Sequence, residues 1–287
     1  MANGKEIKGR IRSVRNIGQI TKAMELVSAA KMRKAQAQAR SSRTYAKLSS
    51  ALLENLASRT QEQNHPLLSH AYSPEDAQGQ ALVLVIGPDK GLAGALNLNL
   101  IQKTLEVVKQ ENHRTDFVTI GKKSTDAIRR IGSKIVATFD ARDREVSIND
   151  ARPIAQIAIN EFVNGHYTRV FIVYTDFVST LVQKPAVLRL LPLAKVSEPD
   201  SEEYLFEPSP DDVWDNLIYR TIEFAVYQSM LEAVASEHSA RMVAMRNANQ
   251  SATDLVSELQ LSYNQARQAA ITKELSEISA AKLAMEG

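Results

Sequence analysis

Residues 252–270, ATDLVSELQLSYNQARQAA, carry the pattern that decides the fold of this 287-residue chain. Their apolar side chains recur at alternating steps of four and three residues, which is the repeat of a coiled-coil seam. The repeat lies inside residues 211–286, which contain neither glycine nor proline. Because glycine and proline interrupt helices most strongly, this stretch predicts one very long helix, on the order of 110 Å from end to end. The seam residues are Ala252, Val256, Leu259, Tyr263, Ala266 and Ala270.

The N-terminal arm has the same character. Residues 19–65 also lack glycine and proline, and apolar residues recur at helical spacing from residue 7 onward. Two such helices can pair as an antiparallel coiled coil, with the chain between them closing the far end. The apolar stripe of the arm consists of Ile7, Ile11, Val14, Ile17, Ile20, Met24 and Val27.

Strand-like and helical segments alternate between the two arms. Residues 81–87 (ALVLVIG), 116–121, 134–139 and 169–177 are strand-like, residues 98–110, 123–131 and 148–164 are helical, and residues 181–193 add an extended segment interrupted by Pro185 and Pro192. The alternation is typical of an α/β domain with a mostly parallel sheet. We therefore predict a fold of the α+β and α/β classes: a long antiparallel coiled coil of the N- and C-terminal helices with an inserted Rossmann-like α/β domain. The predicted segments are an N-terminal coiled-coil helix (1–62), a linker (63–80), the α/β domain (81–193), an acidic, proline-rich linker (194–210) and a C-terminal coiled-coil helix (211–287).

Charge is distributed unevenly along the chain. The formal net charge is only +2, but residues 1–47 contain 12 basic and 2 acidic side chains. The arm thus carries +10 and the remaining residues carry −8. This asymmetry favours an acidic or polyanionic partner for the N-terminal arm.

The sequence contains no recognisable active site. Cysteine is absent, so thiol chemistry and cysteine-ligated metals are excluded, and the five histidines have no metal-ligand spacing. Residues 87–94, GPDKGLAG, follow a predicted strand as phosphate loops do, but match neither common phosphate-binding pattern. A tight strand-to-helix turn is the preferred interpretation. We expect no cofactor, no metal and no catalytic residue, and no apolar run reaches the roughly 18 residues of a membrane span.

Several segments of the sequence resemble the gamma subunit of rotary F-type ATP synthases of bacterial type. They are residues 20–36 (ITKAMELVSAAKMRKAQ), 89–97 (DKGLAGALN), 204–208 (YLFEP), 236–249 (SEHSARMVAMRNAN) and 259–278 (LQLSYNQARQAAITKELSEI). Their order is unbroken from about residue 5 to residue 278. The resemblance implies a non-catalytic central-stalk rotor. This rotor couples ion flow through the membrane c ring to ATP synthesis or hydrolysis in a ring of three alpha and three beta subunits.

The same resemblance implies partners and contact residues. The expected partners are the alpha and beta subunits, the epsilon subunit and the c ring, with neither nucleic acid nor membrane insertion. The expected location is the cytoplasmic side of the cell membrane, as a peripheral component. By resemblance, Tyr204 and Glu207 match the foot that meets the c ring. Residues that match beta-subunit contacts are Met24, Lys31, Arg33, Arg267, Gln268 and Thr272.

Two other classes of protein fit parts of the sequence. A coiled-coil scaffold or nucleic-acid-binding protein would use the basic arm for phosphate contacts, although the arm has a single aromatic residue, Tyr45, and no known binding motif. A small α/β enzyme with helical extensions would bind a nucleotide at residues 87–94. Co-purification with alpha and beta ATPase subunits would separate the three.

Overall fold

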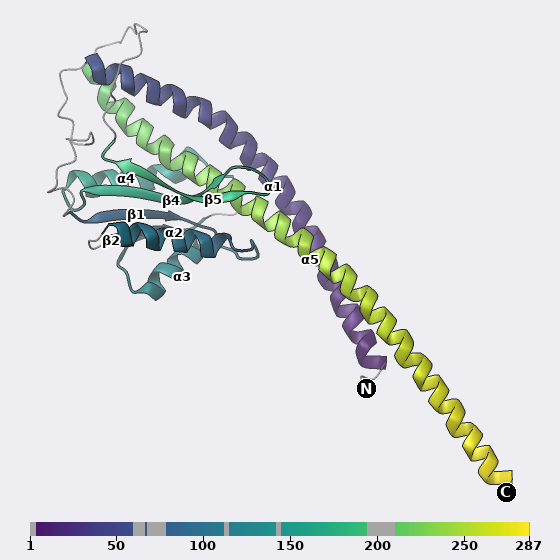
Figure 1. Ribbon diagram of the computed structural model, residues 1–287. Coiled ribbons are helices and arrows are strands. Elements are labelled where there is room, and N and C mark those ends of the chain that lie inside the picture. The colour runs from purple at the N-terminus through teal and green to yellow at the C-terminus, as the bar shows by residue number, and fades with distance from the viewer. Residues whose placement is uncertain are drawn as a thin grey trace. The chain divides into compact units, whose positions relative to one another are not determined.

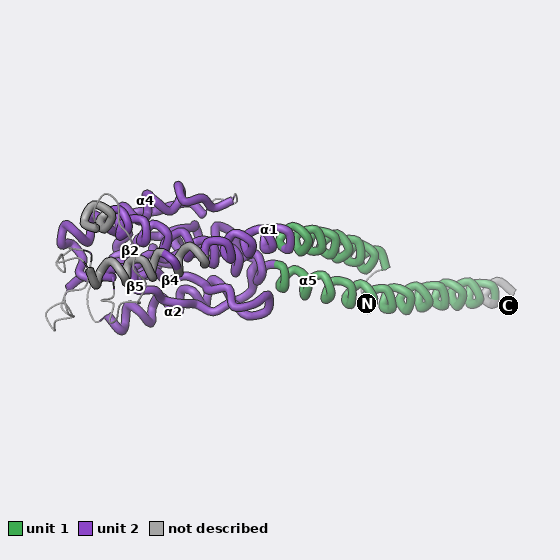
Figure 2. Tube along the Cα trace, turned by 90° about the horizontal axis from the view of Figure 1, so that it is seen from above, with its two compact units in different colours: residues 1–28, 242–287 green, residues 29–241 purple. Residues whose placement is uncertain are grey.

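The computed structural model describes residues 4–59, 67, 79–111, 115–141, 145–193 and 210–286. Its longest elements are two helices, α1 (Gly4–Arg59) and α5 (Pro210–Glu286), as Figure 1 shows. The chain divides into two compact units, residues 1–28 with 242–287 (unit 1) and residues 29–241 (unit 2), coloured separately in Figure 2. Unit 1 therefore consists of the N-terminal part of α1 and the C-terminal part of α5.

The two helices of unit 1 run antiparallel. A Cβ atom added at Gly4 would lie 3.7 Å from the ring of Tyr263, and one added at Gly18 would lie 3.6 Å from the Cβ of Ala252. Moving along α1 from Gly4 to Gly18, the facing residue on α5 thus changes from Tyr263 back to Ala252, as in an antiparallel pair. This confirms the predicted pairing of the terminal helices.

In unit 2 the rest of α1 also packs on α5. Ala39 is buried in the same core as Ile222 and Val226 of α5. The side chain of Gln228 donates to the backbone carbonyl of Ala39 at 3.5 Å, and the hydroxyl of Ser42 contacts the Gln228 side chain.

A five-stranded sheet forms the centre of unit 2, in the order β3-β2-β1-β4-β5. Strands β1 (Ala81–Ile86), β2 (Thr115–Ile120), β3 (Ile135–Phe139) and β4 (Arg169–Phe177) are parallel. The edge strand β5 (Gln183–Leu191) is antiparallel to β4 and continues through Pro185. An edge strand tolerates proline because it has a partner on one side only. The predicted, mostly parallel α/β sheet is confirmed.

Helices cover both faces of this sheet. Strand β1 is buried at all six positions, as its unbroken apolar run predicts. Leu82, Leu84 and Ile86 point into a core shared with α4 (Ile148–Val163) and α5, while Val83 and Val85 point into a second core with α2 (Leu96–Gln110) and α3 (Lys122–Ile131). The middle of α5 therefore belongs to the α/β core as well as to the helix pair. The predicted linkers, residues 63–80 and 194–210, lie almost entirely outside the described residues.

Candidate interaction surface

In unit 1 the side of α1 that faces α5 follows a regular repeat. Its members are separated by alternating steps of three and four residues, and every one is buried or half-buried. The same spacing continues in unit 2 with the buried residues Met32, Ala35 and Ala39. Apart from three apolar side chains, the unit 1 members are small or polar. They are Gly4, Ile7, Ile11, Val14, Gly18, Thr21, Glu25 and Ser28.

This repeat corrects the predicted apolar stripe of the arm. The prediction agrees with the structure at Ile7, Ile11 and Val14, but Ile17, Ile20 and Val27 are 53%, 59% and 56% exposed. After Val14 the apolar residues no longer coincide with the seam positions, and small or polar residues occupy the buried positions instead. A seam that uses such residues allows the helices to approach closely and buries little apolar area.

The displaced apolar residues form a surface of their own. Ile17, Ile20, Met24 and Val27 follow steps of three, four and three, so they share one side of α1. We call these four residues the outer face. Three of them are exposed and Met24 is half-buried. Exposed apolar strips of this kind on an otherwise polar surface are typical of protein–protein contact sites.

An ion cluster crosses the seam of unit 1 beside the outer face. The carboxylate of Glu25 lies 2.9 Å from Nζ of Lys22 and 3.4 Å from Nε of Arg246 on α5. The hydrogen bond from Lys22 lowers the pKa of Glu25; burial opposes this effect, and the charges of Lys22 and Arg246 reinforce it. Glu25 is therefore an ionised carboxylate inside a helix seam. Sequence reasoning missed this role, although Glu25 is one of only two acids in the basic arm.

The C-terminal part of α5 has a different environment. Ala252, Val256, Leu259, Tyr263 and Ala266 are buried or half-buried as predicted, whereas Ala270 is exposed. The described part of α1 begins opposite Tyr263, and every residue from 267 to 282 is exposed. Three large apolar side chains of this segment, Ile271, Leu275 and Ile278, are 49%, 60% and 66% exposed.

The predicted beta-contact residues fall into separate groups. Arg267, Gln268 and Thr272 are all exposed on this segment of α5. Met24 lies next to Glu25, which pairs with Arg246, so about 30 Å of helix separates its level from that of Arg267. The structure thus brings the three α5 residues together but does not bring them to Met24.

The other predicted contact residues lie elsewhere. Lys31 is half-buried and Arg33 is exposed, both on the part of α1 that belongs to unit 2. Tyr204 and Glu207, the predicted contacts with the c ring, lie outside the described residues.

The loop after β1 is a structural turn, as expected. The carboxylate of Asp89 accepts the backbone N–H of Lys122, the first residue of α3, at 2.9 Å. It also accepts the N–H of Ala141 at 3.3 Å. Asp89 thereby ties the loop to the N-terminus of α3 and to the chain after β3. Leu92 and Gly94, both with φ of +60°, complete the turn.

A buried arginine fixes this loop to α5. Arg241 donates to the backbone carbonyl of Lys90 at 3.3 Å and to that of Gly91 at 3.1 Å and 3.2 Å. Its charge is balanced by Glu237 at 2.7 Å. These contacts join residues about 150 positions apart in the chain, so no local pattern could have shown them.

Known proteins share this architecture and sequence. The sequence matches a family profile described as ATP synthase over residues 3–285. The ATP synthase gamma chain of Herpetosiphon aurantiacus is 42% identical over 297 residues, covering 99% of both chains. That of Pelotomaculum thermopropionicum is 41% identical over 290 residues and covers all of both chains. The chain belongs to the ATP synthase gamma chain family.

Solved structures agree on the fold. A chain of the rotor of the Euglena gracilis mitochondrial ATP synthase is 20% identical, has a TM-score of 0.66 and covers 93% of this chain and 98% of its own. A chain of the central stalk and c-ring structure from Tetrahymena thermophila is 21% identical, with a TM-score of 0.62 and coverage of 80% and 99%. Membership of the family confirms the prediction of a central-stalk rotor component. No helix in the part of the chain that the structure describes is long and apolar enough to span a membrane.

Proposed function

We propose that this chain passes torque between a c ring and the beta subunits of an ATP synthase, and that it has no catalytic role itself. The observation that carries the proposal is the outward placement of apolar and cationic side chains on both long helices. On α1 the seam uses small and polar residues, so Ile17 and Ile20 are exposed and can contact other subunits; on α5, Ile271 and Leu275 are exposed in the segment beyond the residues that pair with the described part of α1.

Coupling requires that the rotor bind its partners unequally. A partner with equal affinity for every conformation of the beta subunit would shift none of them. Each orientation of the rotor must therefore stabilise one set of beta conformations over the others. The two exposed surfaces of unit 1 suit this requirement because they differ in chemistry and lie at different levels of the helix pair.

On α5 we assign the contacts to Arg267, Gln268 and Thr272. Arginine offers a planar fork of donors that matches a carboxylate or several loop carbonyls. Gln268 and Thr272 lie one turn apart on the same side of the helix, where a single loop can reach both. All three side chains are exposed.

On α1 we assign an apolar contact to Met24 within the outer face. Lys31 and Arg33 add positive charge for an acidic loop of the beta subunit. Single exposed ion pairs contribute only about 0–1 kcal/mol each, so the apolar strip carries most of this contact.

The remaining assignments concern the base of the rotor. We place Tyr204 and Glu207 at the polar loops of the c ring, and the epsilon subunit beside the α/β domain. This arrangement makes the chain a peripheral component on the cytoplasmic side of the membrane. The alpha and beta subunits supply the nucleotide sites.

Reconstitution with alpha and beta subunits tests the α5 assignment. The double variant Arg267→Leu, Gln268→Leu removes the charge-assisted hydrogen bonds of the arginine, worth about 1.5–3 kcal/mol each, and the neutral ones of the glutamine, worth about 0.5–1.5 kcal/mol each, so ATP hydrolysis by the reconstituted ring should fall at least tenfold. The matched control is Asn264→Leu, Gln265→Leu, which adds similar apolar side chains at exposed positions one turn earlier. We expect the control to retain turnover. Equal turnover of the two double variants would contradict the assignment.

A further inference from the structure

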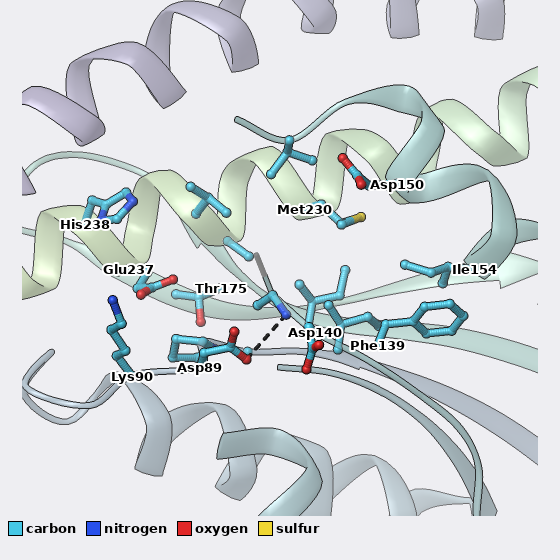
Figure 3. A pocket seen from close by; sticks show the side chains of 18 of the residues that line it. Asp89, Lys90, Phe139, Asp140, Asp150, Ile154, Thr175, Met230, Glu237 and His238 are labelled. Carbon is cyan, nitrogen blue, oxygen red and sulfur yellow. Dashed lines mark hydrogen bonds between the residues drawn. The ribbon is translucent and has the colours of Figure 1, made fainter. Parts of the chain in front are cut away.

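A cavity of about 560 Å³ lies at the carboxyl ends of the parallel strands in unit 2. It is bounded by the ends of β1, β2 and β3, the first turns of α4 and the middle of α5 (Figure 3). Strand order reverses between β1 and β4, and ligands of open α/β sheets bind beside this switch point. The volume falls within the range of about 300–1,000 Å³ typical of small-molecule sites.

Thr175 of β4 lines the cavity with an unused hydroxyl group. Its side chain is 3% exposed, and its Oγ1 makes no hydrogen bond to any residue that the structure describes. The backbone carbonyl of the same residue is satisfied by the hydroxyl of Ser236 at 3.0 Å. Figure 3 shows Thr175 between Glu237 of α5 and Asp89 of the loop after β1. A buried hydroxyl without a partner is costly, and a bound ligand would satisfy it.

The charges around the cavity select the ligand. Among the described lining residues the carboxylates outnumber the basic side chains, which are Lys90 and His238. The N-termini of α3 and α4 beside the cavity already hold carboxylates, whereas that of α2, which begins at the lining residue Leu96, has no acidic residue in its first turn. Asp89 accepts the N–H of Lys122 at α3, and Asp150 accepts the N–H and hydroxyl of Ser147 at α4. The excess of carboxylates over basic side chains disfavours a phosphate group in this cavity. The lining carboxylates are Asp89, Asp140, Glu145, Asp150 and Glu237.

The rest of the lining is apolar. Ile86, Ile120 and Ile154 come from the sheet and α4, and Met230 and Val234 from α5. Such a surface accommodates a hydrocarbon body next to a charged head.

We propose that this cavity is a binding site for a small organic cation, a protonated amine with an apolar body. The ammonium group lies toward Thr175, Asp89 and Asp140, and the body packs against Met230 and the isoleucines. Binding at this place joins β4, the loop after β1 and α5 through one ligand. The site is independent of the surfaces assigned to the beta subunit.

Methyl NMR spectroscopy of the full chain, with labelled isoleucines, tests the proposal using 3-phenylpropylamine as the probe. We expect saturable shifts of the Ile86, Ile120 and Ile154 methyl groups with a Kd on the order of 1 mM, a realistic affinity for a ligand of this size. The neutral analogue 3-phenylpropanol should bind about tenfold more weakly, and 4-phenylbutyrate should leave these methyl groups unshifted.

Two conservative variants locate the ammonium group. Thr175→Val keeps the side-chain shape and removes the hydroxyl, and should weaken amine binding about fivefold. Asp140→Asn removes an exposed charge and should weaken the amine but not the alcohol. Binding of the carboxylate as tight as that of the amine, shifts that do not saturate, or amine affinity unchanged in both variants would overturn the proposal.

Discussion

Strand β1 and the N-terminal part of α1 bury their residues by opposite rules. All six positions of β1 are apolar and buried. In unit 1, α1 instead buries Gly18, Thr21, Glu25 and Ser28 or half-buries them, and leaves Ile17 and Ile20 exposed. In the sheet, hydrophobicity decides what is buried. In the helix pair, the period of the seam decides: Ile7 and Ile11 coincide with it and are buried, whereas Ile17 and Ile20 fall off it and are exposed.

The contrast between the two regions should be largest in the free energy of unfolding when one apolar residue of each is truncated. Leu84 is fully buried in β1, so Leu84→Ala should lower the free energy of unfolding by about 3 kcal/mol. Ile20→Ala on the outer face should change it by less than about 0.5 kcal/mol. Urea titrations followed by circular dichroism measure both changes. A cost at Ile20 as large as that at Leu84 would mean that the outer face supports the fold of the chain itself.

Substituting Glu25, the charged residue of the α1 seam, should have the next largest effect on the free energy of unfolding. Glu25→Gln removes the ionic contacts to Lys22 and Arg246 and should cost about 1–2 kcal/mol near neutral pH. The folded pKa of Glu25 is lowered from its ordinary value of 4.5, so this stabilisation is complete above pH 4.5 and is lost as the pH falls through the folded pKa. The stability difference between wild type and variant should therefore shrink at acidic pH.

Glu6 supplies the matched control for Glu25. It forms an exposed ion pair with Arg10 at 2.7 Å on the same helix. Glu6→Gln should cost less than about 0.5 kcal/mol at any pH. A difference between Glu25→Gln and wild type that persists unchanged at low pH would show that packing, rather than charge, holds Glu25 in the seam.

Replacing glycines of α1 by alanine should change the free energy of unfolding least, and should raise it rather than lower it. Gly9 has open space around it, and a Cβ atom at Gly18 would make ordinary contacts at 3.6 Å with Ala252 and Asn249. Gly9→Ala and Gly18→Ala should each raise the free energy of unfolding by up to about 1 kcal/mol through helix propensity. Thermal unfolding measures both. Stabilisation at Gly9 combined with a loss at Gly18 would show that the seam needs a closer approach than alanine allows.

The sequence predicted the parts of the molecule that local pattern controls. The strands of the sheet follow from unbroken apolar runs such as residues 81–86, and the α5 seam follows from its regular repeat as far as Ala266. The α1 seam did not follow, because Gly18, Thr21 and Ser28 give no hydrophobic signal. Arg241 and Asp89 were also missed, since their partners lie far away in the chain. The candidate contact residues came from family resemblance, and their roles stay predictions.

The edge strand β5 has a consequence for solubility before assembly. No strand that the structure describes pairs with its outer edge, and such an edge invites pairing between copies of a protein. β5 carries Lys184, Pro185 and Arg189 along its length, while Val187 and Leu188 are 38% and 37% exposed. Charged side chains on an edge strand, and a proline that lacks a backbone N–H, both discourage edge-to-edge aggregation. A free copy of the chain is therefore protected against pairing with a second copy through β5.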